Sequence, residues 1–343
     1  MSLHILRPGL LTTVQDLGRF GFQQDGIIVS GAMDALALRV ANLLVGNEET
    51  AAGLEITLAG PVIRFDTDYL LALTGAPLAA TLNGRPLGLN RAVRVAAGAE
   101  LVCGPVRAGC RAYMAVAGGV AVPPVLGSRS TYLRAGFGGL AGRALRAGDV
   151  LPVGEPSALS ARLVRPLPGP TAVEKAGEPT FAMVSSGFTP GPTLCPVPAA
   201  QPMLRAVRGP EYGQFSATSQ QAFWNEPFTI TPEADRMGYR LLGPALLQST
   251  QTELLSGAVT FGTVQVPAGG QPIVLLADHQ TTGGYPRIAQ VISADFSRLA
   301  QARPGQPLRF REVSLEEAQA LYLAQEQRLR ALRQALEIKA GSS

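Results

Sequence analysis

Hydrophobic and polar positions alternate with a period of two over much of the chain, which is typical of short β-strands. In the first half the pattern covers residues 54–58, 69–73, 80–82, 93–95, 113–116 and 150–153. Asn83 and Gly84 follow the third of these segments, and this dipeptide predicts a tight hairpin turn. The second half repeats the pattern at residues 204–208, 228–230, 253–255, 259–266, 273–277, 288–292 and 308–313. Many short strands with few helices predict a mainly-β fold of barrels or sandwiches.

A helix is predicted between two of the earliest segments, because apolar residues recur there at helical spacing. Positions 33, 36, 37, 40 and 44 are apolar and fall on one side of a helix. Ser30 or Asp34 can accept hydrogen bonds from the amides of the first turn. Gly46 and Asn47 supply the residues that commonly end a helix.

A second helix is predicted at residues 314–339. Ser314 and Glu317 have the spacing of a capping box, in which the hydroxyl and the carboxylate satisfy amides at the helix start. Apolar residues at positions 315, 322, 329 and 336 recur every seven residues. The helix packs either on the protein's own body or on a partner, and about two to three heptads do not distinguish the two.

The chain of 343 residues is too long for one ordinary core, so two domains are expected. Prolines accumulate between residues 155 and 201, which predicts an extended connection. The expected parts are an N-terminal domain at 1–165, a proline-rich connection at 166–201, a C-terminal domain at 202–313 and a C-terminal helix at 314–339.

Composition narrows the classes of function. Charged residues make up 16% of the chain, against roughly 25% in an average soluble domain, so a partner chain is expected to cover part of the surface. The net charge of +4 is spread along the chain without a basic cluster, which argues against nucleic acid. Three cysteines without a Cys-x-x-Cys spacing, and His4 and His279 as the only histidines, argue against a metal site and a disulfide framework. The chain lacks a signal sequence and an apolar run of ~18 residues, so we expect a cytoplasmic protein without membrane contact.

The densest group of polar side chains follows directly on an apolar run at residues 272–276. It contains Asp278, His279, Gln280, Thr281, Thr282 and Tyr285. Buried polar groups need hydrogen-bond partners, so packing alone does not favour such a set at the end of a core strand. The segment is therefore either the lip of a polar site or a solvated turn.

Other polar side chains lie in apolar surroundings, namely Asp16, Arg19, Asp34, Arg236, Arg240 and Gln265. Asp34 is equally well explained as a carboxylate at a helix N-terminus. Arg236 can form a turn-orienting pair with Asp235, or it can bind a carboxylate-bearing ligand together with Arg240. Asp278 or His279 could then act as general base. The chain has no Gly-x-Ser-x-Gly elbow, and its glycine-rich segment 136–142 lacks the Lys-Ser/Thr ending of a phosphate-binding loop.

Seven of these segments together resemble one family. They are residues 13–19 (TVQDLGR), 30–34 (SGAMD), 42–47 (NLLVGN), 54–57 (LEIT), 127–132 (GSRSTY), 235–241 (DRMGYRL) and 278–286 (DHQTTGGYP). In this order they resemble the biotin-dependent carboxyltransferase family, also called the allophanate hydrolase subunit 2 or KipA/PxpC family. The resemblance runs from about residue 5 to residue 320.

The resemblance implies two cyclophilin-like β-barrel domains. It also implies a likeness to the C subunit (PxpC) of ATP-dependent 5-oxoprolinase, which hydrolyses 5-oxoproline (pyroglutamate) to glutamate with a KipI-like (PxpB) subunit and a LamB/YcsF-like (PxpA) subunit. Two other roles fit the same resemblance. One is the carboxyltransferase subunit of a urea carboxylase-type biotin-dependent enzyme, and the other is a non-enzymatic KipA-type regulator that binds a KipI-like kinase inhibitor.

Roles for the candidate residues follow from the first of these activities. Arg236 or Arg240 would hold the substrate carboxylate, and Asp278 would handle protons. Gln265, Gln280 and Thr281 would orient the amide. His279 completes the catalytic segment, and further substrate contacts are expected from Asp16, Arg19, Asp34, Thr282 and Tyr285.

Two departures from the family pattern limit the chemistry. The chain has no Met-Lys-Met sequence, so it is expected to carry no covalently bound biotin. Ala234 stands where family members often have a serine, which removes one hydroxyl from the turn at 235–241. The sequence does not locate the ATP site, and a partner subunit is an alternative place for it.

Overall fold

The computed structural model describes residues 1–163, 190–249 and 254–341. These residues form two compact units. The first is Met1–Gly18, Asp34–Val197 and Gln327–Ser343, and the second is Arg19–Met33 and Pro198–Glu326. Each unit thus includes a segment that is distant in sequence from its main part. The domain ranges expected from the sequence are continuous and do not contain these segments. Most of the connection expected at 166–201 lies outside the described residues.

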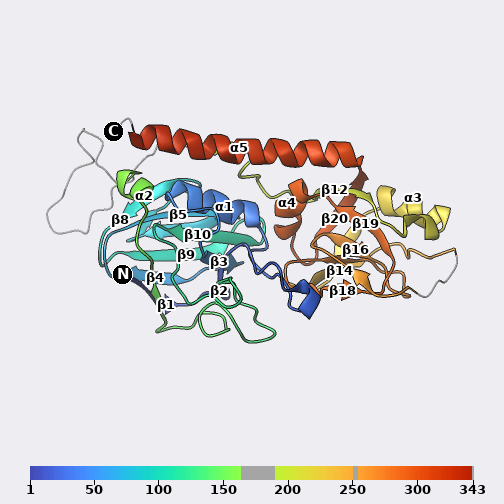
Figure 1. Ribbon diagram of the computed structural model, residues 1–343, viewed down its shortest axis with the longest axis horizontal. Helices are drawn as coiled ribbons and strands as arrows, with labels where there is room; N and C mark the ends of the chain where they lie inside the picture. The colour runs from blue at the N-terminus through green and yellow to red at the C-terminus, as the bar shows by residue number, and fades with distance from the viewer. Residues whose placement is uncertain (164–189, 250–253, 342–343) are drawn as a thin grey trace. The chain divides into compact units, whose positions relative to one another are not determined.

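Two antiparallel sheets form the first unit (Figure 1). The six-stranded sheet, in spatial order, consists of β11 (Val150–Pro152), β1 (Ser2–Arg7), β4 (Val62–Phe65), β9 (Glu100–Val106), β6 (Leu78–Leu82) and β7 (Arg85–Pro86). The five-stranded sheet consists of β2 (Leu11–Gln15), β3 (Gly53–Thr57), β10 (Arg111–Val116), β5 (Tyr69–Gly75) and β8 (Ala92–Val95). Buried side chains of both sheets, such as Ile63 and Met114, belong to a single apolar core.

The hairpin predicted at Asn83 and Gly84 is confirmed. These residues have φ values of 48° and 78°, and Leu82 pairs with Arg85 across the turn. Positive φ at both central residues is the geometry of the two-residue turn that matches the twist of antiparallel strands. The Asn83-Gly84 dipeptide is therefore a sufficient local signal for the β6–β7 hairpin.

Helix α1 (Ala35–Leu44) covers the outer face of the five-stranded sheet (Figure 1). Leu36 and Leu44 are buried against that face, as the helical spacing predicts. Asp34 is the N-cap, and its Oδ1 accepts a hydrogen bond from the N–H of Ala37 at 3.0 Å. Of the two caps considered from the sequence, Asp34 fills the role and Ser30 does not. A short helix, α2 (Ala158–Leu163), also belongs to this unit.

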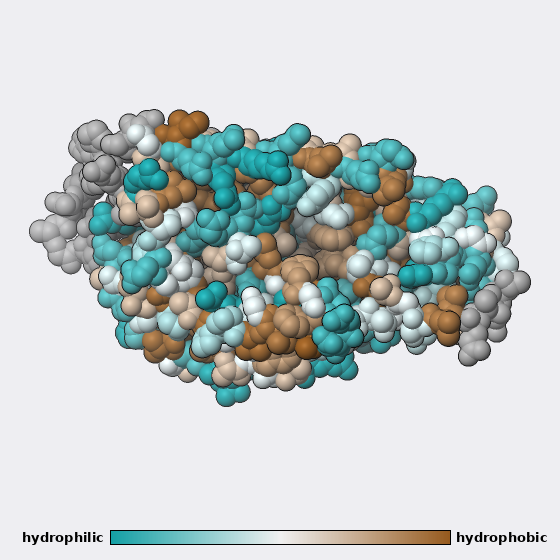
Figure 2. All heavy atoms as spheres, in the orientation of Figure 1, coloured by the Kyte–Doolittle hydropathy of each residue, from teal (hydrophilic) through white to brown (hydrophobic). Residues whose placement is uncertain are grey.

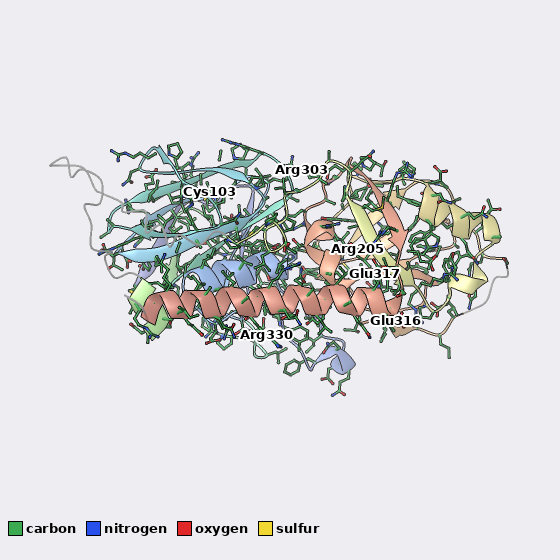
Figure 3. All side chains as sticks on the ribbon, turned by 90° about the horizontal axis from the view of Figure 1, so that it is seen from above. Cys103, Arg205, Arg303, Glu316, Glu317 and Arg330 are labelled. Atoms are coloured by element: carbon green, nitrogen blue, oxygen red, sulfur yellow. The ribbon has the colours of Figure 1, made fainter. Side chains whose placement is uncertain are left out.

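Helix α5 (Leu315–Gly341) begins directly after the predicted cap. The N–H of Glu317 donates to Oγ of Ser314 at 3.1 Å, and Glu316 and Glu317 lie in the first turn (Figure 3). No helix in the described ranges is long and apolar enough to cross a membrane.

The C-terminal part of α5 packs on the first unit. Leu329, Leu332 and Leu336 are buried in the same cluster as α1. Arg333 Nη2 lies 3.0 Å from Oε1 of Glu49. The side of α5 seen in Figure 2 is mostly hydrophilic. Of the two alternatives for this helix, packing on the protein's own body is the one observed for residues 327–341.

A closed barrel forms the centre of the second unit. Its strands, in spatial order, are β12 (Met203–Arg208), β19 (Arg287–Val291), β16 (Thr263–Gln265), β17 (Ile273–Leu275), β14 (Gly238–Leu242), β13 (Phe228–Ile230) and β20 (Pro307–Glu312). β15 (Gly257–Ala258) and β18 (Thr282–Gly283) form a separate two-stranded sheet. The helical segments are η1 (Gln23–Asp25), η2 (Tyr212–Gln214), α3 (Ala217–Asn225), η3 (Ser293–Asp295) and α4 (Phe296–Ala300). The predicted mainly-β fold with a barrel and a C-terminal helix is confirmed.

Side-chain contacts connect the barrel strands of this unit to its helical segments. Phe223 of α3 stacks on Phe310 of β20 with the ring centroids 4.5 Å apart. Arg205 of β12, labelled in Figure 3, forms an ion pair with the fully buried Asp295, with Nη2 and Oδ1 2.6 Å apart. An aromatic contact therefore joins α3 to β20, and a buried ion pair joins β12 to η3, across long stretches of sequence.

Three segments of the second unit differ from the strand pattern. The segment 259–266 is reduced to β16, because Gly262 turns the chain with a φ of 84°. Residues 254–255 lie outside any strand, Leu255 is 96% exposed, and residue 253 is outside the described residues. The predicted turn at 235–240 covers only its first residues, where Oδ1 of Asp235 accepts from the N–H groups of Met237 and Gly238. The chain is already extended in β14 from Gly238 onward.

Candidate functional site

Arg236 and Asp278 meet where β14 begins and β17 ends. The two strands are antiparallel neighbours with Gly238 opposite Leu275, so the residues just outside them are adjacent. The N–H of Asp278 donates to the carbonyl oxygen of Arg236 at 2.8 Å. Arg236 Nε and Nη2 lie 2.9 and 3.0 Å from Oδ2 and Oδ1 of Asp278. Both residues are buried, so the ion pair fixes the start of the 278–286 segment. The partner of Arg236 is thus Asp278, and Asp235 instead forms a turn with its own following amides.

The segment Arg19–Met33 also contacts this ion pair. Ser30 Oγ donates to Oδ1 of Asp278 at 2.7 Å, and Arg236 Nη2 donates to the carbonyl oxygen of Gly31 at 2.6 Å. Ser30 has a φ of 56°, a left-handed conformation that is uncommon for a residue with a side chain. Asp278 therefore accepts hydrogen bonds on both oxygens, and it serves as an anchor more readily than as a general base.

His279 is the next residue, and its ring has a defined tautomer. Nδ1 lies 2.5 Å from the carbonyl oxygen of Gln280, so Nδ1 carries the proton and donates it. Burial lowers the pKa of His279 below 6.5, although the Gln280 carbonyl and the Asp278 charge act in the opposite direction. Within the described residues Nε2 has no hydrogen-bond partner. The structure thus provides a neutral imidazole whose Nε2 lone pair can accept a proton.

Gln265 lies on β16 beneath the same segment. Its Nε2 donates to the carbonyl oxygen of Tyr285, and its Oε1 accepts from Nε2 of Gln280, both at 3.4 Å. The side chain is 1% exposed although Val264 and Val266 flank it on the strand. Gln265 and Gln280 are therefore brought together by a side-chain contact, and their part in a polar site stays a prediction.

The ribbon formed by β15 and β18 is held by an arginine that the sequence analysis did not single out. Arg287 Nη1 donates to the carbonyl oxygen of Ala258 at 3.2 Å. Arg287 Nε and Nη2 donate to the two oxygens of Glu211 at 2.8 and 2.6 Å. The side-chain hydrogen bonds from Arg287 lower the pKa of Glu211, so this pair stays ionised.

Three residues predicted to contact substrate are exposed. Arg240 is exposed on β14, between the buried Tyr239 and Leu241, so its side chain lies on the outside of the barrel. Thr282 is exposed in β18, and Tyr285 is 51% exposed. Roles for these three residues in binding substrate stay predictions.

Asp16 belongs to the first unit and organises a loop. Its Oδ1 accepts from Oγ of Ser128 and Ser130 at 2.6 and 2.5 Å and from the N–H of Gly18 at 2.9 Å. Its Oδ2 accepts from the N–H of Arg129 at 2.5 Å. The carboxylate therefore ties two of the seven motif segments together, which gives it a structural role in addition to the predicted contact with substrate.

Asp34 and Arg19 are both buried, in different units. Asp34 caps α1, and its N–H donates to the hydroxyl of Tyr113 at 2.8 Å. Tyr113 Oη in turn donates to Oε2 of Glu55 at 2.7 Å. These contacts agree with the helix-cap interpretation of Asp34. Arg19 is 1% exposed and belongs to the second unit, with the site of Asp278.

The residues that sequence reasoning missed are Ser30 as an anchor of Asp278, and the Glu211–Arg287 pair. The sequence offers Ser30 only as a possible helix cap, within the motif segment 30–34. Its contact with Asp278 spans 248 residues of sequence and the Glu211–Arg287 contact spans 76. Pairings at such separations leave no local pattern in the chain.

Comparison with known proteins identifies the family. Residues 25–312 match the family model described as carboxyltransferase domain, subdomain A and B. The chain is 45% identical to the 5-oxoprolinase C subunit of Escherichia coli over 92% of its length and 93% of that protein. It is 39% identical to the 5-oxoprolinase C subunit of Haemophilus influenzae over 90% of both chains.

The solved structure of urea amidolyase from K. lactis has the same fold. It superimposes on 96% of this chain with a TM-score of 0.84 and 28% sequence identity. This chain spans only 20% of that much longer protein. The motif positions, the closed barrel and these matches agree, and the chain belongs to the family of carboxyltransferase domains, subdomains A and B.

Proposed function

We propose that this chain is the C subunit of an ATP-dependent 5-oxoprolinase, which opens 5-oxoproline to glutamate together with a KipI-like and a LamB/YcsF-like subunit. The observation that carries the proposal is the nearly end-to-end match to two proteins named as the C subunit of 5-oxoprolinase. A charge content of 16% supports a surface that partner chains cover. Activity therefore belongs to the assembled complex in the cytoplasm.

His279 is the group that this site offers for moving a proton. To open a cyclic amide, water attacks the carbonyl carbon, the ring C–N bond breaks, and a base that takes a proton from the water passes it to the departing nitrogen. Because burial lowers the pKa of His279, the ring is neutral at pH 7, and Nε2 is the nitrogen able to accept the proton. Asp278 and Arg236 fix the backbone on which the imidazole is carried. Asp278 contributes a negative charge that stabilises the protonated ring.

The glycine-rich segment of this chain does not fit a phosphate cradle. The N–H groups of Gly136, Gly139 and Gly142 already donate to backbone carbonyl oxygens at 3.0, 3.1 and 2.8 Å. The only lysines are Lys175 and Lys339, and neither follows a glycine-rich turn. The segment therefore gives no support to an ATP site at 136–142, and we propose a partner subunit as the place where ATP binds.

The test is reconstitution with a KipI-like and a LamB/YcsF-like subunit. We expect glutamate to form from 5-oxoproline only when all three subunits and ATP are present. His279→Asn should assemble normally and release glutamate at least about 100-fold more slowly, the loss expected for a removed general base. An intact complex that makes no glutamate would contradict the proposal.

A second candidate function is carboxyl transfer to urea with biotin on a separate carrier protein. Its support is the TM-score of 0.84 with the K. lactis urea amidolyase. The chain has no biotinylation sequence of its own. Carboxylation of urea by this chain with a biotinylated carrier, in a preparation that leaves 5-oxoproline intact, would favour this second function.

A further inference from the structure

Gln265 is buried, yet its carboxamide is held only weakly. The two hydrogen bonds to Tyr285 and Gln280 are each 3.4 Å long, close to the upper limit for such bonds. A primary carboxamide offers two N–H donors and an oxygen with two acceptor positions. Within the described part of the chain, these two long bonds are the only ones that it makes. Half of its hydrogen-bonding capacity thus remains for a ligand that carries both a donor and an acceptor.

The backbone of Gly283 lies directly against this carboxamide. A β-carbon built on Gly283 would come within 2.5 Å of Nε2 of Gln265, so any side chain there would displace the amide. Gly283 belongs to β18, which pairs with β15 in a sheet of two very short strands. An isolated two-stranded ribbon is marginally stable at best. The ribbon therefore covers Gln265, and Arg287 ties it to the barrel through Ala258; a ligand that bonds the carboxamide must displace the ribbon from it.

We propose that Gln265 recognises the substrate through the paired N–H and C=O of an amide. Its Nε2 would donate to the substrate carbonyl, and its Oε1 would accept from the substrate N–H. Both bonds can form only when the N–H and the C=O lie on the same side of the amide. A five-membered lactam ring enforces that arrangement, and urea presents the same pair of groups. The inference rests on the proposed function for the ring amide.

The surroundings of Gln265 favour a neutral amide over a charged group at this position. The nearby Asp278 and Arg236 satisfy each other's charges, so neither presents an open charge to a ligand beside Gln265. A lactone of the same ring size has an oxygen where the lactam has N–H. The lactone would place that ring oxygen against Oε1 of Gln265. Two buried acceptors then face each other, so no hydrogen bond forms, and the free-energy cost of removing both from water remains.

The inference is tested by comparing two ligands that differ only in that atom. Binding of 5-oxoproline and of its lactone counterpart is measured by equilibrium dialysis on the full chain assembled with its partner subunits, without ATP. We expect the lactam to bind at least about 10-fold more tightly than the lactone, because a site built to bond an N–H discriminates against the analogue that lacks it. Gln265→Met should weaken the lactam at least about 10-fold and lower its preference over the lactone, since it keeps the size of the side chain and removes the acceptor for the lactam N–H.

Two further variants keep the result interpretable. Gly283→Ala should also reduce the preference for the lactam, because the added methyl group displaces the carboxamide of Gln265. Gln290→Met is the matched control on the neighbouring strand, where the carboxamide already bonds Thr263, Phe261 and Val291. It should lower the melting temperature and leave the ratio of the two ligands unchanged.

The outcomes separate this inference from the proposed function. Equal binding of both ligands, no binding of either by the folded wild-type complex, or an unchanged ratio in a folded Gln265→Met variant would overturn the inference. Glutamate release is measured on the same preparations. A ratio that depends on Gln265 without glutamate release would contradict only the 5-oxoprolinase proposal. Glutamate release with an unchanged KM for 5-oxoproline in Gln265→Met would contradict only the inference.

Discussion

Arg236 and Asp278 form a two-pronged ion pair, with Nε 2.9 Å from Oδ2 and Nη2 3.0 Å from Oδ1. Ser30 Oγ adds a third hydrogen bond to the same carboxylate at 2.7 Å. These three hydrogen bonds fix the position of the Asp278 carboxylate. Because His279 is the next residue, they also fix the position of its backbone. The geometry therefore favours His279 over Asp278 as the group that moves a proton.

The first prediction concerns this pair. Asp278→Ala should lower the free energy of unfolding by about 3–5 kcal/mol, because it leaves the buried guanidinium of Arg236 without its carboxylate. Adding Arg236→Met to that variant should restore part of the loss, since the unpaired charge is then also gone. Urea unfolding of the two single variants and the double variant measures the coupling. Additive losses would show that the two side chains do not stabilise each other.

Asp278→Asn distinguishes an anchor from a base. The amide keeps the shape of the side chain and one acceptor oxygen, so an anchor loses only part of its function. We expect the reconstituted complex to keep measurable glutamate release. Its activity should decline at a lower pH than that of the wild type, because the charge that raises the pKa of His279 is gone. Loss of activity equal to that of His279→Asn would instead assign the proton to Asp278.

The second prediction concerns pH. Burial lowers the pKa of His279 in the folded protein below the ordinary 6.5. Below pH 6.5 the unfolded chain takes up a proton on this ring that the folded chain does not, so the free energy of unfolding should fall as the pH drops. Activity that depends on the neutral ring should persist below pH 6.5 and then decline. Melting temperatures and kcat measured from pH 5 to 8 follow both effects.

His279→Asn is the control for the pH dependence. Its side-chain amide can still donate to the carbonyl oxygen of Gln280, so the fold should be kept. Below pH 6.5 the stability of the variant should fall less than that of the wild type, because the titrating ring is gone. The variant should also lose activity. A variant with the same pH dependence of melting as the wild type would show that another group is responsible.

The third prediction concerns Asp16. Asp16→Ala removes the acceptor of four hydrogen bonds from Ser128, Ser130, Arg129 and Gly18. Hydrogen bonds to charged groups contribute about 1.5–3 kcal/mol each, and they are not additive, so we expect a loss of at least about 3 kcal/mol in urea unfolding.

The matched control for Asp16 is Asp25→Ala. Asp25 is exposed in η1, and its removal should change the free energy of unfolding by less than about 0.5 kcal/mol. If Asp16 acted only on substrate, Asp16→Ala would be as stable as this control and would raise KM for 5-oxoproline.

The fourth prediction concerns Asp34. Asp34→Ala should cost about 1 kcal/mol, because the N–H of Ala37 loses its acceptor at the start of α1. Asp34→Asn should recover most of that loss, since asparagine is an equally good cap. Thermal melting of the two variants measures the difference. A stable Asp34→Asn variant with raised KM would support the substrate contact that the sequence also allowed.

Local rules were sufficient for those elements whose signal lies within a few residues. The Asn83-Gly84 hairpin, the Asp34 cap and the start of α5 after Ser314 all depend on short-range hydrogen bonds or on the φ preference of single residues. The same rules overextended the strand at 259–266, where Gly262 turns the chain within an apolar run. They also missed β14, since the residues around its start favour a turn.

The chemistry of the site could be predicted only in part. The grouping of Asp278, His279 and Gln280 is contiguous in sequence, and the placement of Gln265 among apolar neighbours was visible on its strand. The sequence does not show which of these side chains can accept a proton and which are already hydrogen-bonded. It depends on which nitrogen of His279 is protonated and on which oxygens of Asp278 are occupied.

By itself, the sequence determined the mainly-β architecture, the family and the segments that make up the site, because periodicity and motif spacing are properties of neighbouring residues. Only the tertiary structure decided that Ser30 and Arg236 bond Asp278, that Arg240 is exposed on the outside of the barrel, and that the buried Gln265 makes long hydrogen bonds to Tyr285 and Gln280. The pairing of β14 with β17 brings Arg236 to Asp278, 42 residues away, and the Arg19–Met33 segment brings Ser30 to Asp278, 248 residues away. The pKa and the free lone pairs of a buried group are set by those distant neighbours, whose positions no local pattern encodes.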